Sequence, residues 1–300
     1  MPDSRIEIVK ENIDRLRQDR AHLSEKELAH INELAEILCD EAGEDEIFFF
    51  DDAFISRYKA LTERYTVSGV ADFNLERVNS GENLQRYKEK AFLCTRICDV
   101  LGIRGIKDVG TFFEGLSEER VNSVSCVKSP LADEAYLKIS SVLDDARVVY
   151  ADDLAEACEN VYYGRSTYCI LPFANTLDGR LTTIRALAIK YGLKTSQLCR
   201  VKNNDGEFTS FALMKKELML PVDDSDLYFE IRINGLNAVN ELVSVAMVYG
   251  FEISEISYFS GEGGFCDMTF KVNDESICGF LSYLYLEFPD FIPVGLFKEI

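Results

Sequence analysis

The stretch from Tyr168 to Met214 constrains the fold of this chain more than any other. It opens with an apolar run that is typical of a buried strand, and a polar turn, Phe173–Gly179, follows. A helix-period segment then runs from about Leu181 to Tyr191 and ends at Gly192, the residue type expected just past a helix end. This order of elements predicts an α/β arrangement.

The second half of the stretch carries a hairpin signal. Two apolar runs, Thr195–Val201 and Phe208–Met214, flank the polar segment Asn203-Asn204-Asp205-Gly206. Asparagine, aspartate and glycine in a short connection favour a tight turn between antiparallel strands. We therefore expect these two runs to pair.

The segment before this stretch also alternates between helix and strand. Leu131–Leu143 has helical spacing, Ala146–Tyr150 is typical of a short strand, and Asp152 and Asp153 can cap a helix that reaches Val161. A β-α-β alternation of this kind predicts a largely parallel sheet covered by helices.

The C-terminal segment, residues 225–300, shows a second pattern. It predicts the order β-α-β-β-α-β, which is ferredoxin-like. The expected strands are Leu227–Ile233, Glu252–Tyr258, Cys266–Val272 and Phe291–Phe297; the expected helices are Leu236–Gly250 and Ser276–Phe288, and Gly261–Gly264 is a hairpin turn.

Residues 1–128 are expected to be mostly helical, because apolar side chains recur at helical spacing, as at Ile6, Val9, Ile13 and Leu16 and again in Asn83–Leu101. The expected fold class is α/β plus α+β in three parts. These are a helical N-terminal region (1–128), an α/β domain (129–220) and a C-terminal ferredoxin-like domain (225–300).

Composition limits the partners. The chain has 300 residues, a formal net charge of −20 and a sequence pI near 4.6. Such a surface repels a phosphate backbone or an anionic membrane, so we expect no nucleic-acid and no membrane partner. No apolar run approaches the roughly 20 residues of a membrane span, and Met1–Arg5 lacks the layout of a signal peptide. The expected location is cytoplasmic.

Nine cysteines form an odd, scattered set without a Cys-x-x-Cys pair, and the chain has only two histidines, His22 and His30. Most cysteines sit in apolar patterns, which favours buried thiols over disulfides. No plausible zinc set assembles, and we expect neither a metal nor a cofactor.

Two short motifs resemble those of the prephenate dehydratases, which carry P-I-E-N-S-x-x-G and T-R-F. This chain has Pro172-Phe173-Ala174-Asn175-Thr176-Leu177-Asp178-Gly179 and Thr209-Ser210-Phe211. The segment Arg185–Leu193 is also similar to the family's A-A-x-x-Y-G-L run. The resemblance covers about residues 129–300 and implies one lobe of a periplasmic-binding-protein-like α/β fold, because only Arg180–Phe208 separates the two motifs.

The resemblance also implies site residues. Thr209 corresponds to the threonine assigned to the acid step that expels the substrate's hydroxyl, and Asn175 and Thr176 correspond to the pair that hydrogen-bonds the substrate. Gly179, Ser210 and Phe211 would complete the substrate-binding set. Ser210 stands where the family has an arginine and Ala174 where it has a glutamate, so we expect weak or lost catalysis. The structural alternative is that Asn175, Thr176 and Gly179 form a turn and a helix cap, with Thr209 an ordinary strand residue.

The C-terminal part resembles an ACT domain, the regulatory module that follows the catalytic part of dehydratases. This resemblance implies ligand-binding positions at Asn234, Gly235 and Leu236, which match a G-A-L turn, and at Ser257, which matches an E-S-R-P segment without its Arg-Pro element. It also implies a homodimer.

Two functions remain open, and a third possibility is that the ACT-like strands serve only to form a dimer. The first is a prephenate dehydratase-like protein of phenylalanine metabolism, a lyase if it is active. The second is a non-catalytic ACT protein that senses a small molecule, prephenate or an amino acid, as a dimer. A basic, concave pocket around Thr209 would favour the enzyme, whereas an acidic or filled one would favour the sensor.

Overall fold

The computed structural model describes residues 25–26, 28–39, 52–67, 80–101, 122–140, 143, 146–203, 205–218, 226–236, 238–259 and 264–300. The expected helix around Ile6–Leu16, Asn204 of the hairpin turn and Gly261–Gly263 lie outside these residues. The chain divides into two compact units, 1–104 with Cys278–Phe288, and 105–277 with Pro289–Ile300.

The first unit is helical over its described residues. It contains a helical segment at 28–39, α2 (Asp52–Val67), α3 (Ser80–Val100) and most of α9 (Asp274–Glu287). Glu287 accepts a hydrogen bond from the Tyr58 hydroxyl at 2.6 Å and pairs with Lys90 at 2.5 Å. Because both contacts are largely buried, they hold the end of α9 against α2 and α3.

The second unit is built on one continuous mixed sheet. Its strand order is β2-β1-β3-β6-β5-β10-β7-β9-β8, and β4 pairs with β3 outside this path. The strands β2, β1 and β3 run parallel, as do β5 and β10, and the remaining neighbours are antiparallel. The bounds are β1 (Ser123–Val127), β2 (Arg147–Ala151), β3 (Tyr168–Asn175), β4 (Gly179–Arg180), β5 (Lys194–Lys202), β6 (Phe208–Lys215), β7 (Leu227–Asn234), β8 (Glu252–Phe259), β9 (Phe265–Val272) and β10 (Ile292–Glu299).

Three helices cover the two faces of the α/β half of the sheet. One face carries α5 (Pro130–Ser140) over apolar side chains of β1, β5 and β6, and the other carries α6 (Leu154–Tyr162) and α7 (Thr182–Lys190) over β3 and β6. Because side chains alternate along a strand, each buried strand contributes apolar residues to the cores on both faces of the sheet. Two predicted helix boundaries are confirmed. Asp153 caps α6 by accepting a 2.8 Å hydrogen bond from the Glu156 N–H, and Gly192 adopts φ +63° just past the end of α7.

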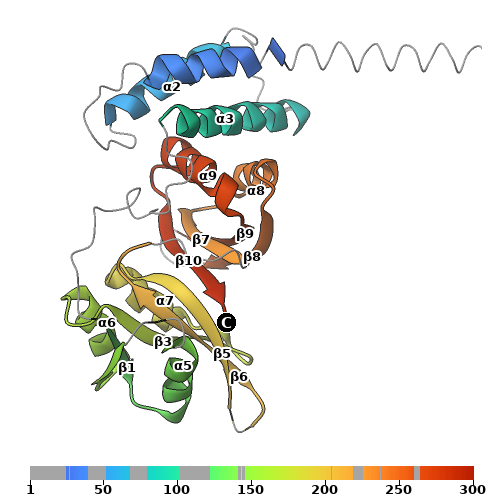
Figure 1. The fold of residues 1–300 in the computed structure, drawn as a ribbon. Coiled ribbons are helices and arrows are strands. Elements are labelled where there is room, and N and C mark those ends of the chain that lie inside the picture. Colours follow the sequence, from blue (N-terminus) through green and yellow to red (C-terminus); the bar gives the residue numbers. More distant parts are fainter. Residues whose placement is uncertain are drawn as a thin grey trace, which may run out of the picture. The chain divides into compact units, whose positions relative to one another are not determined.

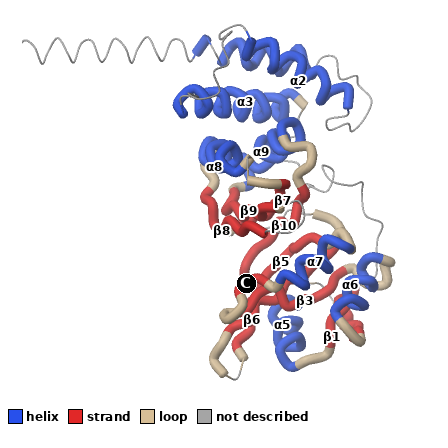
Figure 2. The backbone as a smooth tube through the Cα atoms, turned by 180° about the vertical axis from the view of Figure 1, so that it is seen from behind, coloured by secondary structure: helices blue, strands red, loops and turns tan. Residues whose placement is uncertain are grey.

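The two halves of the sheet join where β10 lies beside β5. Figure 1 shows β10, in red, leaving the strands β7 and β9 and passing to the yellow strand β5, and Figure 2 shows the same strands from behind. Gly295 pairs with Thr195, and a Cβ at position 295 would lie 2.7 Å from the Thr195 carbonyl oxygen. A glycine is therefore required at this crossing.

The ferredoxin-like half has an apolar face and a polar face. Phe229 and Ile231 of β7 are fully buried on one face, together with Met268 and Phe270 of β9. On the other face, Glu230 and Arg232 of β7 face the same way as Asp267 and Thr269 of β9, and all four are buried. A sheet face that is charged and yet buried must be covered by groups that compensate the charges.

The predicted elements are largely confirmed in this unit. The helix before Gly192, the hairpin at Asn203–Gly206 and the β-α-β-β-α-β order after residue 225 are present, although α8 (Val239–Val248) begins three residues later than expected. The sequence did not predict β1, which lies before the expected start of the α/β part at residue 129. The interpretation of Asn175, Thr176 and Gly179 as a helix cap is wrong, because the residue that precedes α7 as its N-cap is Leu181 and makes no side-chain capping bond.

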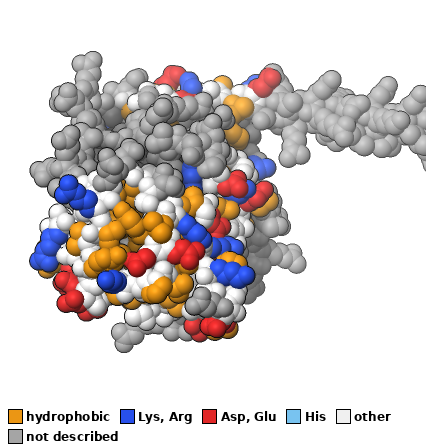
Figure 3. Space-filling view, turned by 60° about the horizontal axis from the view of Figure 1, so that its bottom comes forward, with side chains coloured by type: hydrophobic (Ala, Val, Ile, Leu, Met, Phe, Trp, Pro, Cys, Tyr) orange, Lys and Arg blue, Asp and Glu red, His pale blue; other side chains and the backbone are white. Residues whose placement is uncertain are grey.

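The surface of the described residues mixes apolar and charged groups. Leu137, Tyr150 and Tyr163 are among the exposed large apolar side chains, and Figure 3 shows hydrophobic surface interspersed with Lys, Arg, Asp and Glu on one face. Within the described ranges, no helix is long and apolar enough to cross a membrane.

Candidate functional site

The first predicted motif folds into a self-contained turn at the end of β3. The Asn175 Oδ1 atom accepts hydrogen bonds from the N–H groups of Leu177 (3.0 Å) and Asp178 (2.6 Å), and its Nδ2 donates to Asp178 Oδ2 at 2.9 Å. This is an Asx turn, in which the amide replaces a backbone partner. Gly179 closes the turn at φ +68°, a conformation that favours glycine. The expected turn is confirmed, and it uses both polar atoms of the Asn175 side chain.

The second predicted motif lies directly beside the first. In the β3–β6 ladder Asn175 is opposite Thr209, and Ala174 is opposite Ser210. Because side chains alternate across a strand, Ser210 and Thr209 point to opposite faces of the sheet. Phe211 shares the Thr209 face and belongs to the core under α5.

An open cavity of about 340 Å³ lies on the Ser210 face. It adjoins a second hollow of about 300 Å³, and both are lined by Ala174, Arg200 and Ser210. Arg200 is the partner of Ser210 in the β5–β6 ladder. Thr209 is not among the described residues that line either hollow, whereas Asn175 and Thr176 line the smaller one and Gly179 lines the larger one.

Arg180 forms one wall of the larger cavity and reaches three neighbouring strands. Its guanidinium donates to Glu255 of β8 (3.0 Å from Nε and 2.8 Å from Nη2), to Thr269 of β9 (3.0 Å) and to Glu230 of β7. These three side chains form one row across the ladders, since Thr269 is the register partner of both glutamates. Arg180 thus fastens β4 to the polar face of the ferredoxin-like half.

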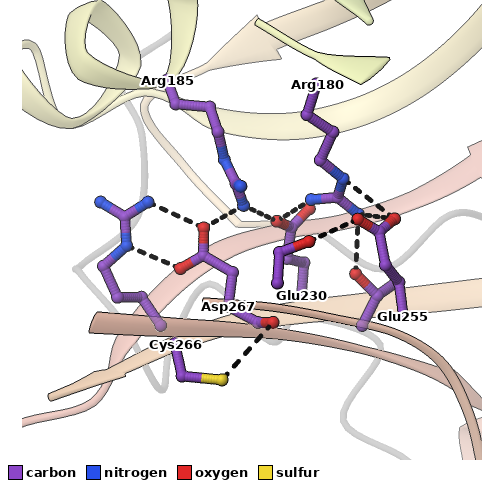
Figure 4. A network of polar contacts seen from close by, with 9 residues as sticks. Arg180, Arg185, Glu230, Glu255, Cys266 and Asp267 are labelled. Carbon is purple, nitrogen blue, oxygen red and sulfur yellow. Dashed lines mark hydrogen bonds and ion pairs between the residues drawn. The ribbon is translucent and has the colours of Figure 1, made fainter. Parts of the chain in front are cut away.

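Arg185 of α7 makes the second attachment to the same face. It pairs with Glu230 at 2.5 Å and with Asp267, while Arg232 binds Asp267 through two hydrogen bonds of 2.7 and 2.8 Å. Figure 4 shows the guanidinium groups of Arg180 and Arg185 pointing from above toward the carboxylates of the sheet. We call Arg180, Arg185, Arg232, Glu230, Glu255 and Asp267 the charge network.

The charge network balances three arginines against three carboxylates, so it compensates the buried charges of the sheet. The Glu230 side chain is fully buried, and burial raises its pKa, while the attraction of Arg180 and Arg185 acts in the opposite direction. Burial also lowers the pKa of Arg185. For Arg180 the attraction of Glu230 and Glu255 outweighs burial and raises the pKa.

The predicted ACT-like positions separate into two places. Asn234 and Leu236 are exposed around Gly235, which has φ +73° and donates its N–H to the Gly264 carbonyl at 2.9 Å. Ser257 lies on β8, with β9 between it and β7, and donates a 2.6 Å hydrogen bond to Glu255. Ser257 therefore supports the charge network, and the other three form a turn.

The sequence patterns did not predict the charge network or the position of Arg200. The sequence of β7 did carry a signal of the charged face. Glu230 and Arg232 alternate with the apolar residues Phe229, Ile231 and Ile233, so one face of this strand is charged and the other is apolar. The charged face of such a strand is usually exposed to solvent. Only the position of α7 and β4 over the charged face of β7 shows that this face is buried. The described residues hold no group of three or more His, Cys, Asp or Glu side chains arranged to bind a metal, and all nine cysteines are buried thiols.

No family model and no curated protein matches the chain. Among solved structures, it is similar to GqqA, described as a novel type of quorum quenching acylase (16% identity, TM-score 0.45, 59% of this chain and 95% of that one). It is also similar to a prephenate dehydratase from Streptococcus mutans (12%, TM-score 0.49, 59% and 98%) and to one from Arthrobacter aurescens in complex with L-Phe (12%, TM-score 0.47, 59% and 89%). Each of these likenesses has a TM-score below 0.5 and an identity of 16% or less.

Proposed function

We propose that this chain is a non-catalytic, prephenate dehydratase-like protein that binds a small carboxylate-bearing molecule in the cavity beside Ser210. The role that follows from binding without turnover is sensing or regulation. The proposal combines the motif resemblance of residues 129–300 with the chemistry of the cavity wall.

The observation that carries the proposal is the position of Arg200. The dehydratase motif has an arginine where this chain has Ser210, and an arginine at that place can hold a carboxylate through two parallel hydrogen bonds. Arg200 is the direct cross-strand partner of Ser210 and lines both hollows. A guanidinium is thus supplied to the same cavity from the neighbouring strand.

The positions of Asn175 and Thr209 favour binding over catalysis. A general acid must lie within hydrogen-bonding distance of the group that leaves. Thr209 points to the sheet face opposite the cavity, and both polar atoms of the Asn175 side chain are engaged in its own turn. The cavity contains arginines and glutamates in equal number, so it is neither the basic pocket expected of the enzyme nor an acidic one.

Prephenate dehydratase activity is the second candidate. It is favoured by the register that sets Asn175 directly opposite Thr209, because two motifs distant in sequence meet at one place. In this reading Thr209, Asn175 and Thr176 would act on prephenate, with Gly179, Ser210 and Phe211 around them. The ACT-like positions Asn234, Gly235, Leu236 and Ser257, and a homodimer, remain predictions under either function.

Isothermal titration calorimetry with 3-phenylpropionate and phenylpyruvate tests the proposal. We expect both to bind and Arg200→Gln to weaken binding roughly tenfold or more, because a hydrogen bond to a charged group contributes about 1.5–3 kcal/mol. Arg147→Gln, an exposed arginine on the edge strand β2, is the matched control. Absence of binding, or equal affinities for the wild type and Arg200→Gln, would contradict the proposal.

Conversion of prephenate to phenylpyruvate by the purified chain tests the alternative. We expect no turnover. Turnover that disappears in Thr209→Ala would establish the enzyme and refute binding without catalysis.

A further inference from the structure

The larger cavity is charge-balanced and has an apolar floor. Its charged lining consists of Arg180, Arg200, Glu255 and Glu299. Four large apolar side chains also line the cavity, and the rings of two of them stack with centroids 5.8 Å apart. The floor residues are Phe173, Leu198, Tyr228 and Phe297, of which Tyr228 and Phe297 are the stacked pair.

One of the two ion pairs in this lining, Arg180 with Glu255, is already held by several other contacts. Arg180 uses Nε, Nη1 and Nη2 within the charge network, and the two oxygens of Glu255 bind Arg180 and Ser257. The Arg180 guanidinium also lies 5.2 Å from the Phe173 ring centroid. This pair therefore acts as a fixed wall of the cavity.

The second ion pair retains binding capacity. Arg200 Nη2 contacts Glu299 Oε1 at 2.7 Å, and this is the one side-chain contact that the described part of the chain gives either charged group. The side chains of Arg200 and Glu299 are 63% and 37% exposed, so both are accessible from the cavity mouth. A guanidinium has five N–H donors and a carboxylate two oxygens, so each can accept a ligand group while the pair persists.

We propose that the ligand of this cavity is a zwitterion, an α-amino acid with an apolar side chain. This inference rests on the proposed binding function. The ligand carboxylate would bind Arg200, the ammonium would bind Glu299, and the side chain would lie on the floor of Leu198, Tyr228 and Phe297. The cavity volume of about 340 Å³ is at the small end of the range for ligand pockets, roughly 300–1,000 Å³.

The charge of the whole protein favours a zwitterion over a mono- or dicarboxylate. The chain carries a net charge of −20, and a ligand with net negative charge is repelled by that field. A zwitterion has no net charge, and two opposite charges placed against an ion pair gain attraction at both ends. Glu299 would repel the carboxylate of a ligand that lacks the ammonium.

Three probes that differ by one charged group each test the inference. L-phenylalanine carries both charges, 3-phenylpropionate lacks the ammonium, and 2-phenylethylamine lacks the carboxylate. We expect L-phenylalanine to bind at least about tenfold more tightly than either analogue in calorimetry. Arg200→Gln should weaken L-phenylalanine and 3-phenylpropionate, whereas Glu299→Gln should weaken L-phenylalanine and leave 3-phenylpropionate unchanged or tighter. Because both side chains are substantially exposed, both variants should keep the wild-type circular dichroism spectrum.

The outcomes separate this inference from the proposed function. Equal binding of 3-phenylpropionate and L-phenylalanine, both weakened by Arg200→Gln, would overturn the zwitterion and leave the carboxylate site in place. No binding of any of the three would overturn both. Loss of L-phenylalanine binding in the double variant Leu236→Ala/Ser257→Ala, with unchanged binding in Arg200→Gln, would assign the amino acid to the ACT-like positions and overturn the inference.

Discussion

Replacing Arg180 by methionine tests whether the charge network holds the α/β half to the ferredoxin-like half. The change removes the partner that Glu230, Glu255 and Thr269 share, and leaves two arginines against three carboxylates. Removing one member of a buried ion pair destabilises a protein by about 3–5 kcal/mol. Glu255 is 43% exposed and can be rehydrated, so we expect the lower end, about 3 kcal/mol.

Arg200→Met is a matched control, because it removes an arginine–glutamate pair from the same cavity. That pair is largely exposed, and exposed pairs contribute about 0–1 kcal/mol. Arg180→Lys is a second control, which keeps the charge but lacks the planar fork and should lie between the wild type and Arg180→Met.

Pulsed thiol labelling of Cys266 in urea measures the effect locally. Cys266 is fully buried on β9, next to Asp267, and becomes reactive only when this strand opens. With a urea dependence of about 2 kcal/mol per molar, a loss of about 3 kcal/mol lowers the labelling midpoint by about 1.5 M. Equal midpoints for Arg180→Met and Arg200→Met would refute the argument that burial makes the Arg180 pair important.

The pH dependence of the same variant gives an independent check. Burial raises the pKa of Glu230 above its ordinary value of 4.5 even with Arg180 present, and removing Arg180 raises it further. As the pH falls toward 4.5, Glu230 is protonated in the folded state before it is protonated in the unfolded state. Proton binding therefore stabilises the folded state over this range. The loss of unfolding free energy in Arg180→Met, relative to the wild type, should therefore be largest at neutral pH and shrink on acidification. A loss that grows on acidification would contradict this.

Three further changes test single features. Gly295→Ala should destabilise by about 1–3 kcal/mol, because its Cβ would lie 2.7 Å from the Thr195 carbonyl oxygen at the β5–β10 crossing; thermal unfolding by circular dichroism measures this, and an unchanged midpoint would disprove the steric argument. In Gly179→Ala the added Cβ meets no atom within 4 Å, so only the φ of +68° should reduce the unfolding free energy, by about 1–2 kcal/mol. The same assay should show a shift in midpoint no larger than that of Gly295→Ala. Burial raises the pKa of Cys126 and of Cys199 to about 11, so neither thiol should react with a disulfide reagent at pH 8 in the folded protein, while both should react in urea; fast labelling of either in the folded state would contradict its burial.

The sequence alone predicted the elements whose signals are local. The helix before Gly192, the hairpin at Asn203–Gly206 and the four strands after residue 225 follow from apolar periodicity and turn residues a few positions apart. The strand β1 was missed because Ser123–Val127 is only five residues long and lies in the part of the chain that was expected to be helical. The dehydratase-like motifs also lie within single strands and turns, which is why the resemblance could be recognised from the sequence, whereas the register that sets Asn175 opposite Thr209 was not predicted.

The tertiary structure decided which of these residues face a common cavity. The alternation of side chains sets Ser210 toward the cavity and Thr209 away from it, and the register of β5 with β6 brings in Arg200. Neither the β5–β10 pairing nor the reach of Arg180 to Glu230 has a local signature, because both depend on the relative placement of segments far apart in the chain. Periodicity records which side of an element is buried, but the identity of the opposing surface is fixed only by packing.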